Sequence, residues 1–207
     1  MKKVLHSIIT EHQSAFIKGR LISDNILVAF ETLHCMQKQN SNTHSYMALK
    51  LDMSKAYDHV EWSFLEELMR KMGFNERWIN LMMMCVRTIS YSVLLNRKPI
   101  GYIKPSRGIR EGDPLSPYLF LLCAEGLSAL LRKAERDRKI SGVSVCRGGP
   151  KISHLLFFDD SLLFCCASSA ECHRLMEVLA MYERASGQMV NKEKTALFFS
   201  KNTPEQV

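Results

Sequence analysis

The chain has 207 residues, of which 46% are hydrophobic and 24% charged. This composition excludes a disordered or low-complexity chain, and the length suits one domain, with room for two lobes. The formal net charge of +7 suits a polyanionic partner such as nucleic acid, although a merely basic protein would show the same value. No apolar stretch is long enough to span a membrane, and the first apolar run is too short for a signal peptide.

The sequence contains seven cysteines, and no two of them have the C-x2-C spacing of a zinc site. Most of them fall in apolar runs such as FLLCAEG and LLFCCAS. We therefore expect small core residues in a protein from a reducing compartment. No segment has the pattern of a targeting signal.

The first clear element is a helix expected over residues 22–38. Asp24 is a candidate N-cap, and apolar residues recur at helical spacing, which predicts a buried stripe. That stripe comprises Ile26, Leu27, Phe30 and Leu33. The polar segment 39–45 that follows predicts a loop.

The rest of the chain alternates strand-like and helix-like segments. In chain order we expect a strand over 46–53, helices over 61–73 and 77–89, a hairpin over 91–108 with its turn at Asn96–Pro99, a helix over 114–137, strands over 142–145, 151–158 and 161–168, a helix over 169–187 and a strand over 194–200. Hairpins among these strands favour an α+β fold, an antiparallel sheet with helices packed on one face, over a doubly wound parallel sheet.

The run LLFFDDSLLF, residues 155–164, holds two adjacent carboxylates, Asp159 and Asp160. Burying an unpaired carboxylate is costly, so we expect two buried strands joined by a hairpin whose two-residue tip is the aspartate pair. A polar turn is one explanation for the pair. The other is a metal site, because adjacent carboxylates raise each other's pKa unless a cation neutralises them.

A second acidic position favours the metal site. Asp52 ends the alternating segment 46–53 and precedes a turn into a helix. Three carboxylates at the ends of neighbouring strands form an oxygen-rich site that suits Mg2+ and would also accept Mn2+. Two such ions activate an attacking hydroxyl and stabilise a leaving pyrophosphate, in a reaction that needs no protein nucleophile.

Five blocks of the sequence together resemble the reverse transcriptase domain of plant non-LTR retrotransposons, the long interspersed element type. They are, in order, QSAFIKGRLISDNILVAFE, LDMSKAYDHVEWSFL, SRGIREGDPLSPYLFLL, HLLFFDDSLLF and SGQMVNKEKTALFFS. One block alone would be weak support, whereas five in order are specific. A non-enzymatic α+β interaction domain that carries an acidic hairpin by chance does not explain them.

The resemblance implies a polymerase of the right-hand type. Residues 1–45 would be a fingers and palm-entry portion and residues 46–200 the palm, with the thumb and the rest of the fingers missing. The implied activity is two-metal transfer of nucleotides from dNTPs to the 3′-hydroxyl of a DNA primer on an RNA template. No membrane partner is implied, and the location would be intracellular, nuclear or cytoplasmic.

The family motifs also imply the roles of individual residues in the catalytic site. Asp52 and Asp159 would bind both metal ions, with Asp160 as the second aspartate of the F-x-D-D turn and the carbonyl of Met53 as a further ligand. Lys194 matches a lysine near the leaving pyrophosphate and would act as general acid or charge stabiliser. An ordinary surface lysine is the alternative.

The nucleotide and nucleic-acid contacts are implied in the same way. Tyr57 matches the aromatic residue that packs under the incoming sugar and excludes a ribose 2′-hydroxyl, and a core aromatic is the alternative. Gly112 would let the backbone approach the base pair closely. Arg107 and Arg110 would meet phosphates or be plain surface charges, and Arg20 would contact the template or the triphosphate.

Three positions depart from the family pattern. Glu111 replaces a glutamine beside the nucleotide, where a carboxylate repels phosphate and donates no hydrogen bond. Phe158, also in the predicted nucleotide site, replaces a small residue and would crowd the primer end, and His59 replaces an arginine. Together with the missing segments, these departures predict weak or absent polymerase activity. The alternative function is a catalytically inactive remnant that at most binds nucleic acid.

Overall fold

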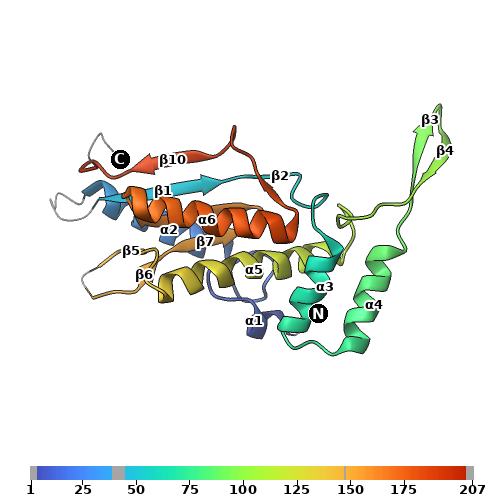
Figure 1. The fold of residues 1–207 in the computed structure, drawn as a ribbon, viewed down its shortest axis with the longest axis horizontal. Helices are drawn as coiled ribbons and strands as arrows, with labels where there is room; N and C mark the ends of the chain where they lie inside the picture. The colour runs from blue at the N-terminus through green and yellow to red at the C-terminus, as the bar shows by residue number, and fades with distance from the viewer. Residues whose placement is uncertain (1–3, 39–44, 147, 204–207) are drawn as a thin grey trace.

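The computed structural model describes residues 4–38, 45–146 and 148–203 of the chain. Its centre is a four-stranded antiparallel sheet with the strand order β10-β1-β8-β7 (Figure 1). The strands are β1 (Tyr46–Leu51), β7 (His154–Phe157), β8 (Asp160–Cys166) and β10 (Ala196–Phe199). Because β1 pairs with strands from much later in the sequence, the sheet depends on contacts between distant segments.

Two long helices cover one face of this sheet. The helices of the described residues are α1 (Leu5–Ile8), α2 (Ile22–Lys38), α3 (Trp62–Lys71), α4 (Glu76–Arg87), α5 (Ser116–Arg136) and α6 (Ser169–Ser186). α5 and α6 lie side by side along the sheet (Figure 1). Leu49 and Leu163 from the sheet are buried there with Leu131 of α5 and Leu179 of α6. Burial of each leucine contributes about 1.5–3 kcal/mol to folding.

The opposite face of the sheet is partly covered by α2. Side chains alternate across a strand, so Ala48 and Phe164 point away from α5 and α6 and pack with Met36 of α2. The expected α+β class with an antiparallel sheet is therefore confirmed. Helices cover both faces rather than one, because both alternate sets of residues in the central strands include buried apolar side chains.

The helix expected over 22–38 has the predicted limits but a different packed face. Ile26, Leu27 and Phe30 are 60%, 62% and 63% exposed, whereas Met36 is buried. The predicted stripe was wrong for these three residues, whereas its fourth member, Leu33, is partly buried against the same cluster as Met36. Apolar residues occur on more than one side of this helix. Only the position of the sheet decides which of them are covered.

The other helix limits agree with the sequence to within two residues at each end. Asp24 lies inside the first turn of α2, where its carboxylate accepts the Leu21 N–H, and does not precede the helix as expected. α6 ends at Gly187, which takes a φ of 75° and closes the helix, as its place in the sequence predicts.

Short strands outside the main sheet divide two of the expected strands. β2 (Met53–Ser54) pairs with β9 (Met189–Val190), and β5 (Val143–Ser144) pairs with β6 (Lys151–Ile152). The strand expected over 46–53 is therefore interrupted at Asp52. The strand expected over 151–158 is interrupted at Ser153, where the chain passes from the β5–β6 pair to the main sheet.

A hairpin of β3 (Tyr91–Leu95) and β4 (Lys98–Ile103) projects beyond α4 (Figure 1). Every residue of both strands is exposed. Its turn is Asn96–Arg97, with φ values of 50° and 64°, the left-handed geometry of a two-residue hairpin link. The turn is shorter than expected, because Lys98 and Pro99 already belong to β4.

The remaining expectations concern membranes, cysteines and the first loop. Among the described residues, no helix has the length and apolar character needed to cross a membrane.

All seven cysteines are free; Cys123 and Cys165 are buried as expected, whereas Cys85 and Cys146 are exposed. Burial raises the pKa of the Cys123 thiol to about 12. Most of the expected loop over 39–45 lies outside the described residues.

Candidate active site

β7 and β8 are joined by the two-residue turn Phe158–Asp159, not by the expected pair Asp159–Asp160. Phe157 pairs with Asp160, which makes Asp160 the first residue of β8. Phe158 has a φ of 56°, a left-handed conformation that costs a non-glycine residue about 1–2 kcal/mol. The turn leaves the side chain of Asp159 exposed at the tip of the hairpin.

Asp52 lies at the end of β1, beside this turn. The β1–β8 register, continued one residue beyond its last pair, sets Asp52 opposite Asp160. The main-chain oxygen of Asp52 accepts a hydrogen bond from the Asn191 N–H at 2.8 Å, at the point where β1 gives way to β2. The three aspartates therefore lie at one end of the sheet, where their strand-end positions predict them.

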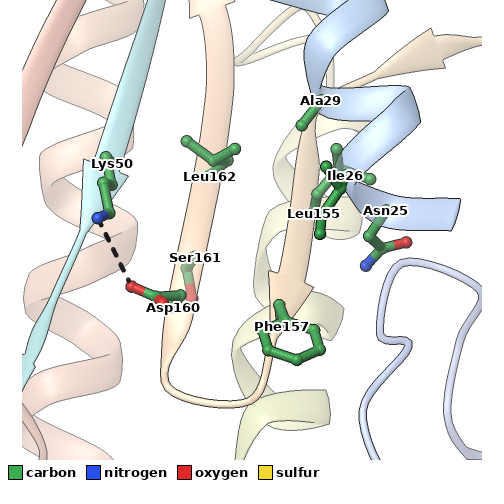
Figure 2. A pocket seen from close by; sticks show the side chains of 9 residues that line it. All are labelled: Asn25, Ile26, Ala29, Lys50, Leu155, Phe157, Asp160, Ser161 and Leu162. Atoms are coloured by element: carbon green, nitrogen blue, oxygen red, sulfur yellow. Dashed lines mark ion pairs between the residues drawn. The ribbon is translucent and has the colours of Figure 1, made fainter. Parts of the chain in front are cut away.

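The carboxylate of Asp160 lies on the same side of the sheet as α2 (Figure 2). Its Oδ1 is 3.9 Å from Nζ of Lys50, and the two side chains are 59% and 51% exposed. Asp160 also lines a pocket of about 300 Å³ with Asn25, Ile26 and Phe157. An ion pair this exposed contributes less than about 1 kcal/mol, so Lys50 can release the carboxylate readily.

A second pocket, of about 430 Å³, joins Asp52 to Lys194. It is lined by Asp52, Met53, Ser54, Lys55, His59, Asn191 and Lys194. Lys194 is exposed and follows a turn in which the side-chain oxygen of Asn191 accepts the N–H groups of Glu193 and Lys194. The predicted lysine therefore shares a pocket with the first predicted metal ligand, although the two lie far apart in the sequence.

Tyr57 belongs to a cluster of aromatic rings at this end of the sheet. Its ring stacks on Phe120 of α5 at a centroid distance of 5.0 Å. Phe158 lies 5.6 Å from Tyr57 and 5.0 Å from Phe120, and Phe16 lies 5.3 Å from Phe158. The ring of Phe158, expected to crowd the primer end, is thus directed onto the tyrosine predicted to lie under the sugar.

The electrostatics of Tyr57 link it to two other predicted site residues. Burial, with smaller contributions from the negative charges of Asp159 and Glu111, raises the pKa of Tyr57 to about 12. The hydroxyl is therefore protonated at neutral pH and can donate a hydrogen bond.

The loop before α5 is attached to the segment that carries Tyr57. The N–H of Gly108 donates to the Val60 carbonyl at 2.8 Å, and the N–H of Ile109 donates to the Tyr57 carbonyl at 3.0 Å. The indole N–H of Trp62 donates to the Gly108 carbonyl at 2.7 Å. A Cβ at Gly108 would approach a main-chain oxygen to 2.7 Å, so only glycine fits there.

Four predicted residues lie on this loop or beside it. Arg107 is half-exposed and lies 3.6 Å from the carboxylate of Glu61, while Arg110 and Glu111 are exposed and available to a ligand. Gly112 has a φ of 81°, and apart from its two neighbours in the chain no described residue has an atom within 4 Å of the position a Cβ would take. The close approach of the base pair to Gly112, which the family resemblance implies, stays a prediction.

Arg20 has a different environment from the one predicted. Its guanidinium donates hydrogen bonds to the main-chain oxygens of Thr10 at 2.5 Å, Gln13 at 2.6 Å and Ile9 at 2.9 Å. These bonds direct the side chain into the protein and hold the segment before α2 in place. The structure gives Arg20 a role in positioning that segment, and its contact with template or triphosphate stays a prediction.

The carboxylates of the predicted metal ligands do not converge on one point in this structure. In the part of the chain that the structure describes, no group of three or more His, Cys, Asp or Glu side chains is arranged to hold a metal ion. Asp159 is exposed at the turn, Asp52 lines the pocket with Lys194, and Asp160 is paired with Lys50. The site offers carboxylates at one end of the sheet that a cation could draw together.

Sequence reasoning missed four polar residues at this site. Lys50 pairs with Asp160, Asn191 holds the end of β1, and Asn25 and Gln13 contact the β7–β8 hairpin. Gln13 and Asn25 stand inside the first block that carries the family resemblance, but nothing in that block indicates their contacts. Lys50 was the most predictable of the four, because it lies two residues before Asp52 and side chains two apart in an extended segment point to the same face.

Comparison with known proteins identifies the family. The model of the family described as reverse transcriptase (RNA-dependent DNA polymerase) matches residues 1–206. The chain belongs to the reverse transcriptase family. The resemblance predicted from the five sequence blocks is therefore confirmed.

Two curated relatives share part of this sequence. An uncharacterised mitochondrial protein of Arabidopsis thaliana is 52% identical over 68 residues, 33% of this chain and 56% of that protein. The Pol polyprotein of the type-1 retrotransposable element R2 from Nasonia vitripennis is 29% identical over 160 residues, 76% of this chain and 14% of the polyprotein. The chain thus spans less than two thirds of either relative.

The solved structure is apo telomerase from Candida tropicalis. It superposes with a TM-score of 0.64 at 12% identity, over 96% of this chain and 35% of the telomerase chain. At this identity the likeness concerns the fold alone. It supports a partial palm and fingers arrangement for the sheet and helices described above.

Proposed function

We propose that this chain is the palm and part of the fingers of an RNA-directed DNA polymerase from a plant non-LTR retrotransposon. Residues 46–200 would be the palm and residues 1–45 the fingers and palm-entry portion. The observation that carries the proposal is the position of Asp52 at the end of β1, beside the Phe158–Asp159 turn, in a chain of the reverse transcriptase family. The similarity to the R2 Pol polyprotein supports the retrotransposon origin.

The carboxylates fit a pair of divalent cations, Mg2+ or Mn2+. Asp52 and Asp159 would hold both ions, with the carbonyl of Met53 as a further ligand. Asp160 would join them after it leaves Lys50, since their exposed ion pair is weak. The bound ions would activate the primer hydroxyl and stabilise the charge on the leaving pyrophosphate.

The protein's own side chains would orient the substrates around this site. Lys194 extends from the wall of the pocket it shares with Asp52, where its ammonium would neutralise or protonate the leaving pyrophosphate. Tyr57, protonated and supported by Phe120, offers a flat ring beneath the sugar of the incoming dNTP. Glu111 near Tyr57 would disfavour a phosphate, which predicts a high KM for dNTPs.

Template and primer would lie across the same end of the sheet. The net charge of +7 favours a polyanion, and phosphate contacts from Arg107 and Arg110 would make the affinity fall with salt. A telomerase structure of this fold was solved with telomeric RNA, and an A-form hybrid is recognised by shape and backbone. We therefore expect an RNA template paired with a DNA primer as the preferred duplex.

Primer extension tests this function. The purified chain is given a DNA primer on an RNA template, dNTPs, and Mg2+ or Mn2+ in separate reactions. We expect slow synthesis that Asp52→Asn and Asp159→Asn each reduce by about a thousandfold or more, because each substitution removes a charge from the metal ligands. Asp137→Asn at the far end of α5 is the matched control and should leave the rate unchanged.

The same experiment identifies the alternative. Synthesis that persists in both aspartate variants would come from a contaminating polymerase and would contradict the proposal. If no synthesis is seen with either metal ion while the hybrid still binds in a salt-dependent way, the chain is the inactive remnant. Restoring the family residues with Glu111→Gln and Phe158→Ala together would then show whether these two departures silenced the site.

A further inference from the structure

The segment before α2 extends the main sheet beside β7. Gln13 forms a parallel bridge with Leu156, whose N–H donates to the His12 carbonyl at 2.8 Å. The side-chain amide of Asn25 donates to the carbonyls of His12 at 3.1 Å and Leu156 at 2.9 Å. This segment therefore behaves as a short additional strand at the edge of the sheet that carries the catalytic turn.

The side chain of Gln13 connects this segment to the turn itself. Gln13 is only 1% exposed, and its Oε1 accepts the N–H of Ala15 at 2.9 Å and the N–H of Phe158 at 3.3 Å. Phe158 is the left-handed residue of the turn, and Asp159 is the next residue in the chain. One amide oxygen thus restrains the main chain immediately before the proposed metal ligand.

Gln13 is in turn held by Arg20. The guanidinium of Arg20 binds the carbonyl of Gln13 at 2.6 Å and two further carbonyls of the same segment. These bonds leave the Gln13 backbone little freedom, so its side chain approaches the turn from a fixed point. Fixed hydrogen bonds around a functional group are what keep it in a productive geometry.

The side-chain amide of Gln13 carries a free-energy cost at this buried position. Its Nε2 has no hydrogen-bond partner among the described residues, and an unsatisfied buried donor costs about 1–3 kcal/mol. An apolar side chain of similar length would fill the space without that cost. What the amide adds is an oxygen that accepts two N–H groups, that of Ala15 in its own segment and that of Phe158 in the turn. The bond to Phe158 is the one that joins this segment to the turn.

We propose that Gln13 is a positioning residue for the catalytic turn: its amide oxygen fixes the Phe158 N–H and thereby holds Asp159 where it can bind metal. This inference rests on the proposed function. The left-handed Phe158 is the least favourable residue of the turn, so the turn relaxes when this bond is lost. Asp159 then spends less time in the metal-binding geometry, while the rest of the sheet stays folded.

Amide hydrogen exchange tests the contact without any need for activity. Gln13→Met keeps the length and burial of the side chain but removes the acceptor, and Gln13→Glu keeps an acceptor oxygen. We expect the exchange of the Phe158 N–H to become about tenfold faster in Gln13→Met, the loss of one hydrogen bond, and to change little in Gln13→Glu. Thr32→Val, buried and isosteric within α2, is the control and should leave the Phe158 amide unchanged.

Metal dependence of primer extension tests the consequence. In Gln13→Met we expect the half-saturating Mg2+ concentration to rise about five- to tenfold, with an unchanged affinity for the hybrid duplex, because only the metal ligand is displaced. A role in stability alone would lower the active fraction and leave the Mg2+ dependence as it is in the unmodified chain.

The two readouts separate the inference from the proposed function. Unchanged exchange at Phe158 in Gln13→Met overturns the positioning role whether or not the chain is a polymerase. Equal loss of protection across β7 and β8 in both Gln13 variants also overturns it, since Gln13 would then support the whole sheet edge. Selective loss at Phe158 in a chain without synthesis would support the contact and contradict only the polymerase.

Discussion

The molecule contains two hairpins with two-residue turns, and they differ in what surrounds them. β7 and β8 both belong to the main sheet, β8 as an inner strand and β7 as the end strand, and most of their residues are buried or partly buried. In β3–β4 every strand residue is exposed, and the hairpin projects from the body of the protein (Figure 1). The turn of the first carries the proposed metal ligand, and the turn of the second carries Asn96 and Arg97.

The difference shows how tertiary contacts hold a turn residue in a backbone conformation that its residue type disfavours. Asn96 is a residue that tolerates a positive φ, so local preference favours the first residue of its turn, although Arg97 beside it is also left-handed. Phenylalanine does not readily adopt a positive φ. Phe158 has a φ of 56°, and it makes ring contacts to Phe16 and Tyr57 and a hydrogen bond to Gln13. A strained residue at a functional turn persists where its neighbours fix it.

The largest expected difference is in the free energy of unfolding. It separates the truncation of a buried leucine in one hairpin from the truncation of an exposed leucine in the other. Leu163→Ala in β8 removes a fully buried leucine and should lower the free energy of unfolding by about 2–5 kcal/mol. Leu94→Ala in β3, where the leucine is 73% exposed, should change it by less than about 0.5 kcal/mol. Chemical denaturation of both variants measures this; similar losses would show that β3–β4 is covered in solution.

The next effect is a pH dependence of the free energy of unfolding, which arises from His154 in β7. His154 is buried between Ser128 and Ser153, and its ring stacks on His12 at 4.1 Å. Burial, with smaller contributions from the positive charges of His12 and Arg132, lowers the pKa of His154 from 6.5 to about 3. The folded state therefore favours the neutral ring, whereas the unfolded chain binds a proton near its ordinary pKa.

The sign of the dependence follows from these pKa values. The stabilising contribution of neutral His154 is complete above pH 6.5 and is lost as the pH falls toward about 3. The loss approaches about 1.4 kcal/mol per pH unit. Unfolding free energies measured between pH 7 and 4 should show a shallower decline in His154→Gln. The same change at His173, exposed on α6, should leave the decline as it is.

A smaller effect on stability should accompany an effect on activity at Phe158. Phe158→Ala removes the half-buried ring that packs on Tyr57 and should lower the free energy of unfolding by about 1 kcal/mol. It should also lower the KM for dNTPs about threefold, because the ring no longer covers the face offered to the sugar. Steady-state kinetics check this; a higher KM would show that the ring supports the nucleotide.

The smallest effect on stability should come from the exposed pair at the β7–β8 turn. Lys50→Met breaks the contact of 3.9 Å to Asp160, and with both side chains about half exposed the free energy of unfolding should change by less than about 0.5 kcal/mol. The half-saturating Mg2+ concentration should fall, because Asp160 becomes free to bind. A rise would show that Lys50 orients the carboxylate instead of occupying it.

Several parts of the fold follow from the sequence. Hydrophobic periodicity located the five long helices to within two residues, since a regular apolar pattern is a local property. The five ordered blocks indicated the family, which the comparison confirmed. Apolar runs around Asp159 and Asp160 predicted a hairpin with acidic residues near its tip, but the register placed the turn one residue earlier.

The sequence by itself therefore determined which segments are helical, which carry the carboxylates and which family the chain belongs to. The tertiary structure decided which face of α2 is buried, why Phe158 takes a left-handed turn and where Arg20, Lys50 and Gln13 direct their side chains. The physical reason is the range of the contacts. Helix periodicity and motif spacing depend on neighbours in the chain, whereas burial, strand register and hydrogen bonds between distant segments exist only once the sheet has formed.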